Sequence, residues 1–70
     1  MNAYIQLKSG NFIEIQKLKS ITYPHSSTGA IQVIEKFDNF YLKNLLLTFV
    51  GENSILTIDS KSIEFIKFDT

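Results

Sequence analysis

The sequence of 70 residues predicts an all-β fold. Apolar residues recur at every second position in short runs, which is the pattern of strands with one buried face. Turn-forming Gly, Asn, Asp and Ser residues stand between these runs. We therefore expect one β domain over residues 1–70, with five to six antiparallel strands in a meander that curls into a small barrel or a two-layer sandwich.

The first two runs predict a hairpin. Leu7 precedes the turn segment 9–11 and Ile13 follows it, and each lies two residues from a further isoleucine. Opposite residues of an antiparallel pair share one face of the sheet, so their numbers must have a constant sum. A three-residue loop over 9–11 meets this condition. It sets Leu7 opposite Ile13, with Asn11 in the left-handed conformation that ends such a loop.

The segment 17–23 does not continue this alternation. Its phase breaks at Leu18 and again at Ile21. A β-bulge or a corner between two sheets accounts for such breaks, because either one changes the face that the following residues occupy. We therefore expect a bulge or a sheet corner within this segment.

The middle of the chain has two interpretations. Residues 30–37 predict a strand through Ile31 and Val33. In the first interpretation, a three-residue loop leads into another strand and sets Val33 opposite Leu45. In the second, a helix begins at the Asp-Asn pair that follows, since both residues are good N-caps. The alternation favours the strand, and the sequence leaves the structure of residues 38–47 open.

The last third of the chain predicts two more hairpins. A four-residue loop over 51–54 sets Phe49 opposite Leu56, and a second loop over 59–62 sets Leu56 opposite Phe65. Both loops place the same residues on one face, which predicts the core. The expected core consists of Leu47, Phe49, Leu56, Ile58, Ile63 and Phe65, with Leu7, Ile13 and Ile15 in the same or a facing layer.

Further apolar residues fall on the opposite face of these hairpins. They are Val50, Ile55, Ile66 and Phe68. A small sheet that is apolar on both sides invites aggregation unless another chain covers it. We therefore expect these four residues to mediate self-association, most simply as a symmetric homodimer.

The composition excludes several classes of site. The chain has no cysteine, which excludes disulfides and Cys-based zinc sites. Its seven basic residues are all lysine and are balanced by seven acidic residues, whereas a small nucleic-acid-binding domain usually carries a basic excess. No signal peptide or apolar run of membrane length is visible. We therefore expect a cytoplasmic chain with no membrane contact, no cofactor, no metal and no catalytic residues.

Two segments are candidates for contact with a foreign protein partner. The polar loop after Tyr23 contains Pro24 and the only histidine, His25, followed by hydroxyl side chains. Adjacent residues of one loop rarely form a catalytic pair, so we interpret this loop as a contact surface. The second segment is the aromatic pair Phe40 and Tyr41, because exposed aromatic patches mark protein contacts.

Lysines near aromatic residues give an alternative function. Lys8, Lys17 and Lys19 lie close in sequence to Phe12 and Tyr23. Lysines interleaved with aromatics on a small sheet are typical of oligonucleotide-binding barrels, in which bases stack on the rings. A small nucleic-acid-binding β-barrel is therefore the alternative interpretation.

The two ends of the chain carry a resemblance. The segments YIQLKSGNFIEIQKLKSI (4–21) and LTIDSKSIEFIKF (56–68) resemble short β-meander proteins of low-GC Gram-positive bacteria, their phages and their mobile elements. The resemblance implies an accessory protein of a phage or mobile element that acts by binding another protein. It implies no catalytic or binding residues. We therefore expect a non-enzymatic protein-binding module that self-associates.

Overall fold

The computed structural model describes residues 1–24, 27–38, 40, 42 and 46–69, and within these residues the protein is all-β. This confirms the all-β class that the sequence predicts. The described part of the chain contains seven strands, more than the five or six expected. The strands are β1 (Asn2–Leu7), β2 (Phe12–Ile15), β3 (Leu18–Pro24), β4 (Ile31–Ile34), β5 (Leu46–Gly51), β6 (Ile55–Asp59) and β7 (Ile63–Asp69), with a 3₁₀ turn, η1 (Ser60–Ser62), before β7. Among the described residues, no helix has the length and hydrophobicity required to cross a membrane.

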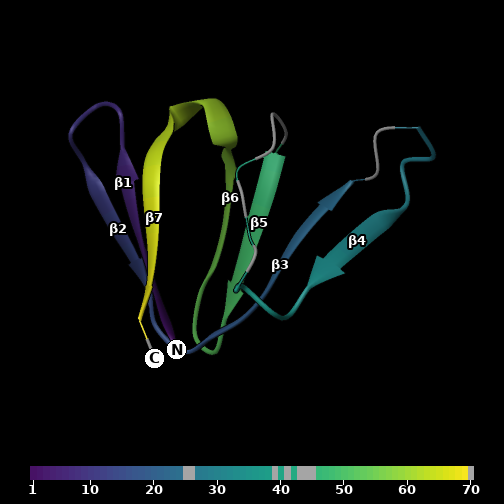
Figure 1. Cartoon of the computed structure of the whole chain (residues 1–70), viewed down its shortest axis with the longest axis horizontal. Coiled ribbons are helices and arrows are strands. Elements are labelled where there is room, and N and C mark those ends of the chain that lie inside the picture. The colour runs from purple at the N-terminus through teal and green to yellow at the C-terminus, as the bar shows by residue number, and fades with distance from the viewer. Residues whose placement is uncertain (25–26, 39, 41, 43–45, 70) are drawn as a thin grey trace.

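The strands form two antiparallel sheets. The three-stranded sheet has the order β2-β1-β7, and the four-stranded sheet has the order β4-β3-β5-β6 (Figure 1). The chain does not pass from each strand to its neighbour as a meander does, because β7 pairs with β1 and β3 pairs with β5. The first and last strands therefore lie side by side, with Asn2 opposite Asp69.

The expected hairpin between the last two strands is wrong. Residues 59–62 form no hairpin loop, because η1 carries the chain from β6 in the four-stranded sheet to β7 in the three-stranded sheet. The side chain of Asp59 stabilises this turn, since its Oδ1 accepts a hydrogen bond from the Lys61 backbone N–H at 2.9 Å. The last strand is thereby free to pair with β1.

The hairpin of β1 and β2 has the expected faces but a shifted register. Ile5 lies opposite Ile13, so the loop consists of residues 8–10 rather than 9–11. Gly10 adopts the left-handed conformation, with a φ of 97°, and its N–H donates to the Leu7 carbonyl at 3.0 Å. Glycine reaches this conformation without the steric cost that another residue pays. Because the shift is two residues, each side chain stays on its expected face.

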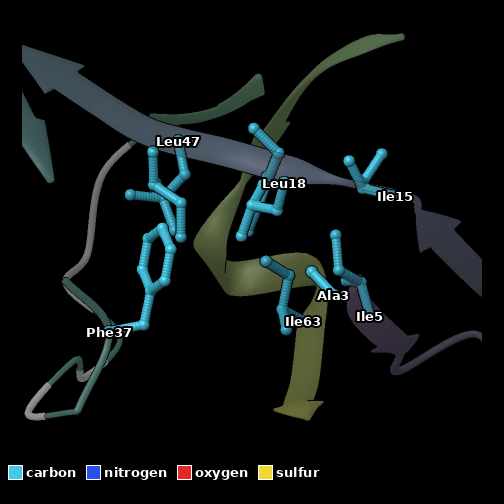
Figure 2. Packing of buried hydrophobic residues seen from close by; sticks show 9 residues of the cluster. Ala3, Ile5, Ile15, Leu18, Phe37, Leu47 and Ile63 are labelled. Carbon is cyan, nitrogen blue, oxygen red and sulfur yellow. The ribbon is translucent and has the colours of Figure 1, made fainter. Parts of the chain in front are cut away.

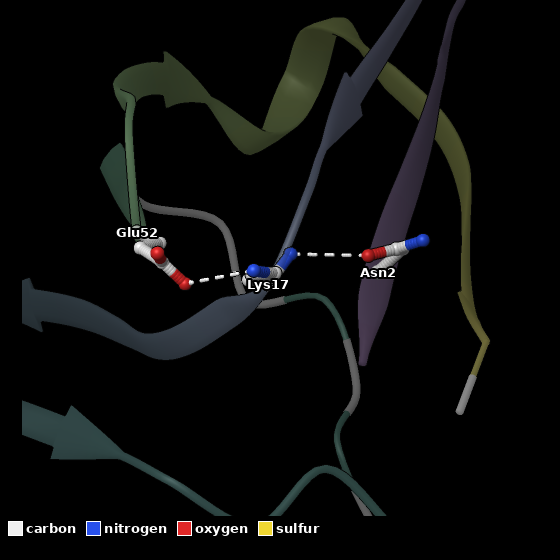
Figure 3. Close-up of polar contacts among 3 residues, drawn as sticks. All are labelled: Asn2, Lys17 and Glu52. Carbon is white, nitrogen blue, oxygen red and sulfur yellow. Dashed lines mark hydrogen bonds and ion pairs between the residues drawn. The ribbon is translucent and has the colours of Figure 1, made fainter.

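The chain turns a corner between β2 and β3, where Lys17 has a φ of 51°. The Lys17 backbone N–H donates to Oδ1 of Asn2 at 3.0 Å (Figure 3). The Leu18 N–H donates to the Met1 carbonyl at 2.7 Å. β3 then contains a bulge against β5 between Leu18 and Ser20. The corner and the bulge account for the predicted breaks of phase.

Lys17 provides a test of this corner. A β-branched residue is strongly disfavoured at a φ of 51°, whereas glycine adopts it freely. We expect Lys17→Val to lower the free energy of unfolding by about 1 kcal/mol relative to Lys17→Gly. Both substitutions remove the exposed ion pair to Glu52, so the ion pair does not contribute to their difference. Urea denaturation of the two variants measures it, and equal midpoints contradict the left-handed conformation.

The register of β5 against β6 is the predicted one, with Phe49 opposite Leu56 across a four-residue loop.

The predicted partner of β4 is wrong. Val33 pairs with Thr22 and Ile31 with Pro24, both of β3, whereas β5 lies between β3 and β6. Residue 45, the predicted partner of Val33, lies outside the described residues. Strands that follow each other along the chain tend to pair, and the connection from β3 to β4 is shorter than the connection from β4 to β5.

The segment before β5 contributes aromatic side chains to the core. Its described residues within 38–47 are Asp38, Phe40 and Leu42, which have neither helix nor strand structure, and Leu46 and Leu47, which begin β5. The ring of Phe37 stacks on Phe68 of β7 at a centroid distance of 4.9 Å, and Phe40 meets the same ring edge-on at 5.7 Å. Phe37 also points toward Leu47 of β5, so it connects the two sheets (Figure 2).

The inward faces of the two sheets share one hydrophobic core (Figure 2). The three-stranded sheet contributes Ala3, Ile5, Ile15 and Ile63, and the four-stranded sheet contributes Leu18, Ile21, Leu47 and Phe49. Of the predicted core, Leu47, Phe49, Ile15 and Ile63 are buried, and Leu7, Ile13, Leu56 and Ile58 pack partly buried against them. These predictions are confirmed.

Phe65 is the predicted core residue that the structure places elsewhere. Its side chain is 52% exposed on the outer face of the three-stranded sheet. The register of β1 against β7 shifts after Gln6, which lies opposite Phe65. This bulge falls between Ile63 and Phe65 and reverses the phase of β7. Ile66 and Phe68 therefore join Ile63 on the inward face.

Candidate interaction surface

The outer face of the four-stranded sheet exposes large aliphatic side chains. They are Ile31 (64% exposed), Val33 (59%), Leu46 (54%) and Ile55 (71%). Each alternates with an inward neighbour, so Leu46 is exposed while Leu47 is buried. The strand registers place Pro24 beside Ile31 and Val50 beside Ile55 on the same surface. We call this surface the aliphatic face, and it consists of Pro24, Ile31, Val33, Leu46, Val50 and Ile55.

The aliphatic face carries almost no charge. In the four described strands that form it, the charged residues are Lys19 and Asp59. Lys19 lies at the bulge of β3, beside the end of β5, whereas Asp59 lies opposite Leu46 at the start of β5. The two opposite charges therefore occupy opposite ends of the sheet and leave its middle uncharged.

Threonines cross the middle of this sheet. Thr22 lies opposite Thr48, and Thr48 lies opposite Thr57 on the next strand. The hydroxyl groups of Thr48 and Thr57 form a hydrogen bond with each other at 2.9 Å. Polar groups that already have a partner cost less to bury than groups that lose water without one. The threonine row is therefore compatible with a partner that covers the aliphatic face.

The outer face of the three-stranded sheet has a different chemistry. The rings of Tyr4 and Phe12 stack with their centroids 5.8 Å apart, and Phe65 lies on the other side of β1. We call Tyr4, Phe12 and Phe65 the aromatic face. Charged residues interrupt it, because Glu14 and Lys67 lie opposite Tyr4 on the two neighbouring strands. This surface is consequently more polar than the aliphatic face.

Of the residues predicted to contact a foreign partner, the structure describes Pro24 and Phe40, which do not share a surface. Pro24, at the end of β3, belongs to the aliphatic face. Phe40 is half-buried against Phe68 in the chain's own core. His25 and Tyr41 lie outside the described residues.

The residues predicted for self-association divide into two pairs. Val50 and Ile55 lie opposite each other on the aliphatic face. Ile66 and Phe68 are half-buried and pack against the core. The bulge in β7 explains this division, because it turns the second pair inward. Val50 and Ile55 therefore remain the residues through which we expect self-association.

The lysines of the alternative interpretation do not converge on one surface. Lys8 lies in the turn after β1, whereas Lys17 follows the far end of β2, so they lie at opposite ends of this hairpin. Nζ of Lys17 also forms an exposed ion pair with Glu52 at 3.5 Å (Figure 3). Tyr23 packs against the core and does not extend the aromatic face around Phe12.

Sequence reasoning missed the outward orientation of three exposed residues, Ile31, Val33 and Leu46. The expected pairing of β4 with the next strand placed Val33 on the core face. The pairing with β3 instead puts Val33 opposite Thr22, on the face that carries the threonines. The available signal was alternation, which places each threonine on the same face of its strand as the aliphatic residues two positions away. Applying this signal to Val33 required knowing which strand lies next to β4.

Comparison of the chain with protein-family models, with curated proteins and with solved structures gave no significant match. Within residues 1–24, 27–38, 40, 42 and 46–69, no three His, Cys, Asp or Glu side chains gather in a way that could hold a metal ion. We therefore infer the function of this chain from its own surface.

Proposed function

We propose that this chain is a non-enzymatic protein-binding module, of the accessory type that phages and mobile elements encode, acting in the cytoplasm. The single observation that carries the proposal is the aliphatic face. Four side chains there are each more than half exposed, and they share a sheet surface whose middle is uncharged. Exposed apolar patches of this kind mark contact sites. The absence of cysteine suits a reducing compartment.

The energetics of the aliphatic face support a contact with protein. Full burial of an Ile, Leu or Val side chain is worth about 1.5–3 kcal/mol. Because Ile31, Val33, Leu46 and Ile55 keep more than half of their surface in water, covering all four would contribute about 3–7 kcal/mol. A favourable free energy of this size helps a specific complex to offset the entropy lost on association.

The edge of the four-stranded sheet adds a second attraction. β4 is an edge strand of four residues, and it contains neither proline nor a charged residue. Proline and charge are the usual devices that protect an edge against pairing with another chain. A partner that covers the aliphatic face therefore meets an edge strand without proline or charge beside Ile31 and Val33.

A photo-cross-linker tests the proposal. Benzoylphenylalanine replaces Ile55 on the aliphatic face and, as the matched control, the exposed Glu14 on the other sheet. After irradiation of cells that express the full chain, we expect position 55 to form covalent protein adducts and position 14 to form few. Absence of any protein adduct from position 55 contradicts a protein-binding function.

The aromatic face favours a second candidate function, the binding of single-stranded nucleic acid, since bases stack on exposed rings of small sheets. The chain has zero net charge, so we expect any such binding to be weak and to be lost with salt. Fluorescence anisotropy with labelled oligonucleotides at about 200 mM salt measures it. A complex that persists there, and that Phe12→Ala and Phe65→Ala both abolish, would make nucleic acid the first candidate.

A further inference from the structure

We propose that a second copy of this chain covers the aliphatic face, so that the four-stranded sheets of two copies pack face to face about a twofold axis. The inference rests on the proposed function and names its partner. Sheets packed in this way lie about 10 Å apart, and their facing side chains interdigitate. In a twofold contact, each pairing of residues occurs twice.

The distribution of charge favours an identical partner. Lys19 and Asp59 have opposite signs and lie at opposite ends of the sheet. The chain as a whole also has zero net charge, so two copies approach each other without repulsion. Surfaces that select a foreign protein commonly use charges to reject other partners. The middle of the aliphatic face carries no charge that would reject its own copy.

The size of the face matches the needs of a dimer. A standard stable interface covers about 800 Å² on each partner. That area is about one sixth of the 4695 Å² of accessible surface on this chain. The outward positions of β3, β4, β5 and β6 also amount to about one sixth of the 70 residues. The share of residues on this one face is therefore similar to the share of surface that a twofold dimer covers.

The threonine row suits the centre of such a contact. Thr48 lies midway along β5, between the outward residues Leu46 and Val50. A twofold axis through the middle of the face brings the threonine rows of the two copies together, with aliphatic residues on both sides of them. The hydrogen bond between Thr48 and Thr57 forms within one sheet, which reduces the cost of removing water from this row.

The oligomeric state of the full chain tests the inference. In sedimentation equilibrium from micromolar to millimolar protein, we expect a dimer. Ile55→Lys and Val33→Lys should each raise the dissociation constant about 100-fold or more, because each variant introduces two lysines into the covered apolar surface. The matched control is Phe65→Lys, which adds the same charge at an exposed apolar site on the other sheet and should leave the constant unchanged.

Two results would overturn the inference. One is a chain that stays monomeric over the whole concentration range. The other is a dimer that Ile55→Lys and Val33→Lys leave intact, since the copies would then meet through a different surface, such as the edge of β4. Circular dichroism and thermal unfolding verify that each variant folds, which is expected because both side chains are exposed.

The cross-linker at position 55 separates this inference from the proposed function. A covalent product with twice the mass of the chain supports the second copy. Products that contain only other proteins overturn the inference but agree with the proposed function. Absence of every product contradicts both.

Discussion

Replacement of Phe49 by alanine is expected to lower the free energy of unfolding by about 3–5 kcal/mol. The side chain is fully buried in β5, which lies between β3 and β6, and it packs in the core that the two sheets share. A chain of 70 residues has a total stability of about 4–10 kcal/mol, so this loss approaches the whole. Chemical denaturation at one fixed protein concentration measures the effect, because dimer formation makes stability depend on concentration.

The matched control for this experiment is Phe65→Ala. It deletes the same atoms from a side chain that is 52% exposed on β7, so we expect a loss of about 1 kcal/mol or less. The two phenylalanines would have similar effects if both faced the core, as the alternation of the sequence alone suggests. Equal losses would therefore refute the bulge that turns Phe65 outward.

Gly51→Ala is expected to have the second-largest effect, a loss of about 2–3 kcal/mol. Gly51 is buried at the end of β5, where the corner after β2 packs against it. A Cβ atom at this position would lie 2.7 Å from Cγ2 of Ile15 and 2.9 Å from the backbone oxygen of Gln16. The oxygen belongs to the backbone of the corner, so the clash cannot be relieved by a change of rotamer alone. The melting temperature and the denaturation midpoint should both fall.

A double-mutant cycle verifies the cause of this loss. Ile15→Ala removes one of the two clashing atoms, so Gly51→Ala should cost less in that background than in the original chain. Strict additivity of the two substitutions would show that the corner does not press on β5 in the way described. A neutral effect of Gly51→Ala alone would lead to the same conclusion.

Local patterns were sufficient where the interacting residues are close in sequence. The pairing of β5 with β6 follows from a four-residue loop and from parity, and its predicted register is confirmed. The break of phase near Leu18 predicted the corner or bulge that separates the two sheets. The first hairpin kept its faces although its register moved by two residues, because Gly10 and not Asn11 adopts the left-handed conformation.

The candidate site depended on strand neighbours that parity could not identify. Val50 and Ile55 were predicted to lie outside the core, since both sit next to a well-defined loop. Ile31 and Val33 were placed inward, because the predicted neighbour of β4 was wrong. Alternation shows which residues of a strand share a face. The face that meets solvent can be identified only when the adjacent strand is known.

By itself, the sequence determined the all-β class, most of the core and the two outward residues Val50 and Ile55. Only the tertiary structure decided that β7 leaves β6 to pair with β1, and that a bulge in this pair turns Phe65 outward and Ile66 inward. The physical reason is the range of the interactions. A hairpin is specified by a few neighbouring residues and their turn, whereas the pairing of the two ends of the chain is selected by the shared core, to which all strands must contribute at once.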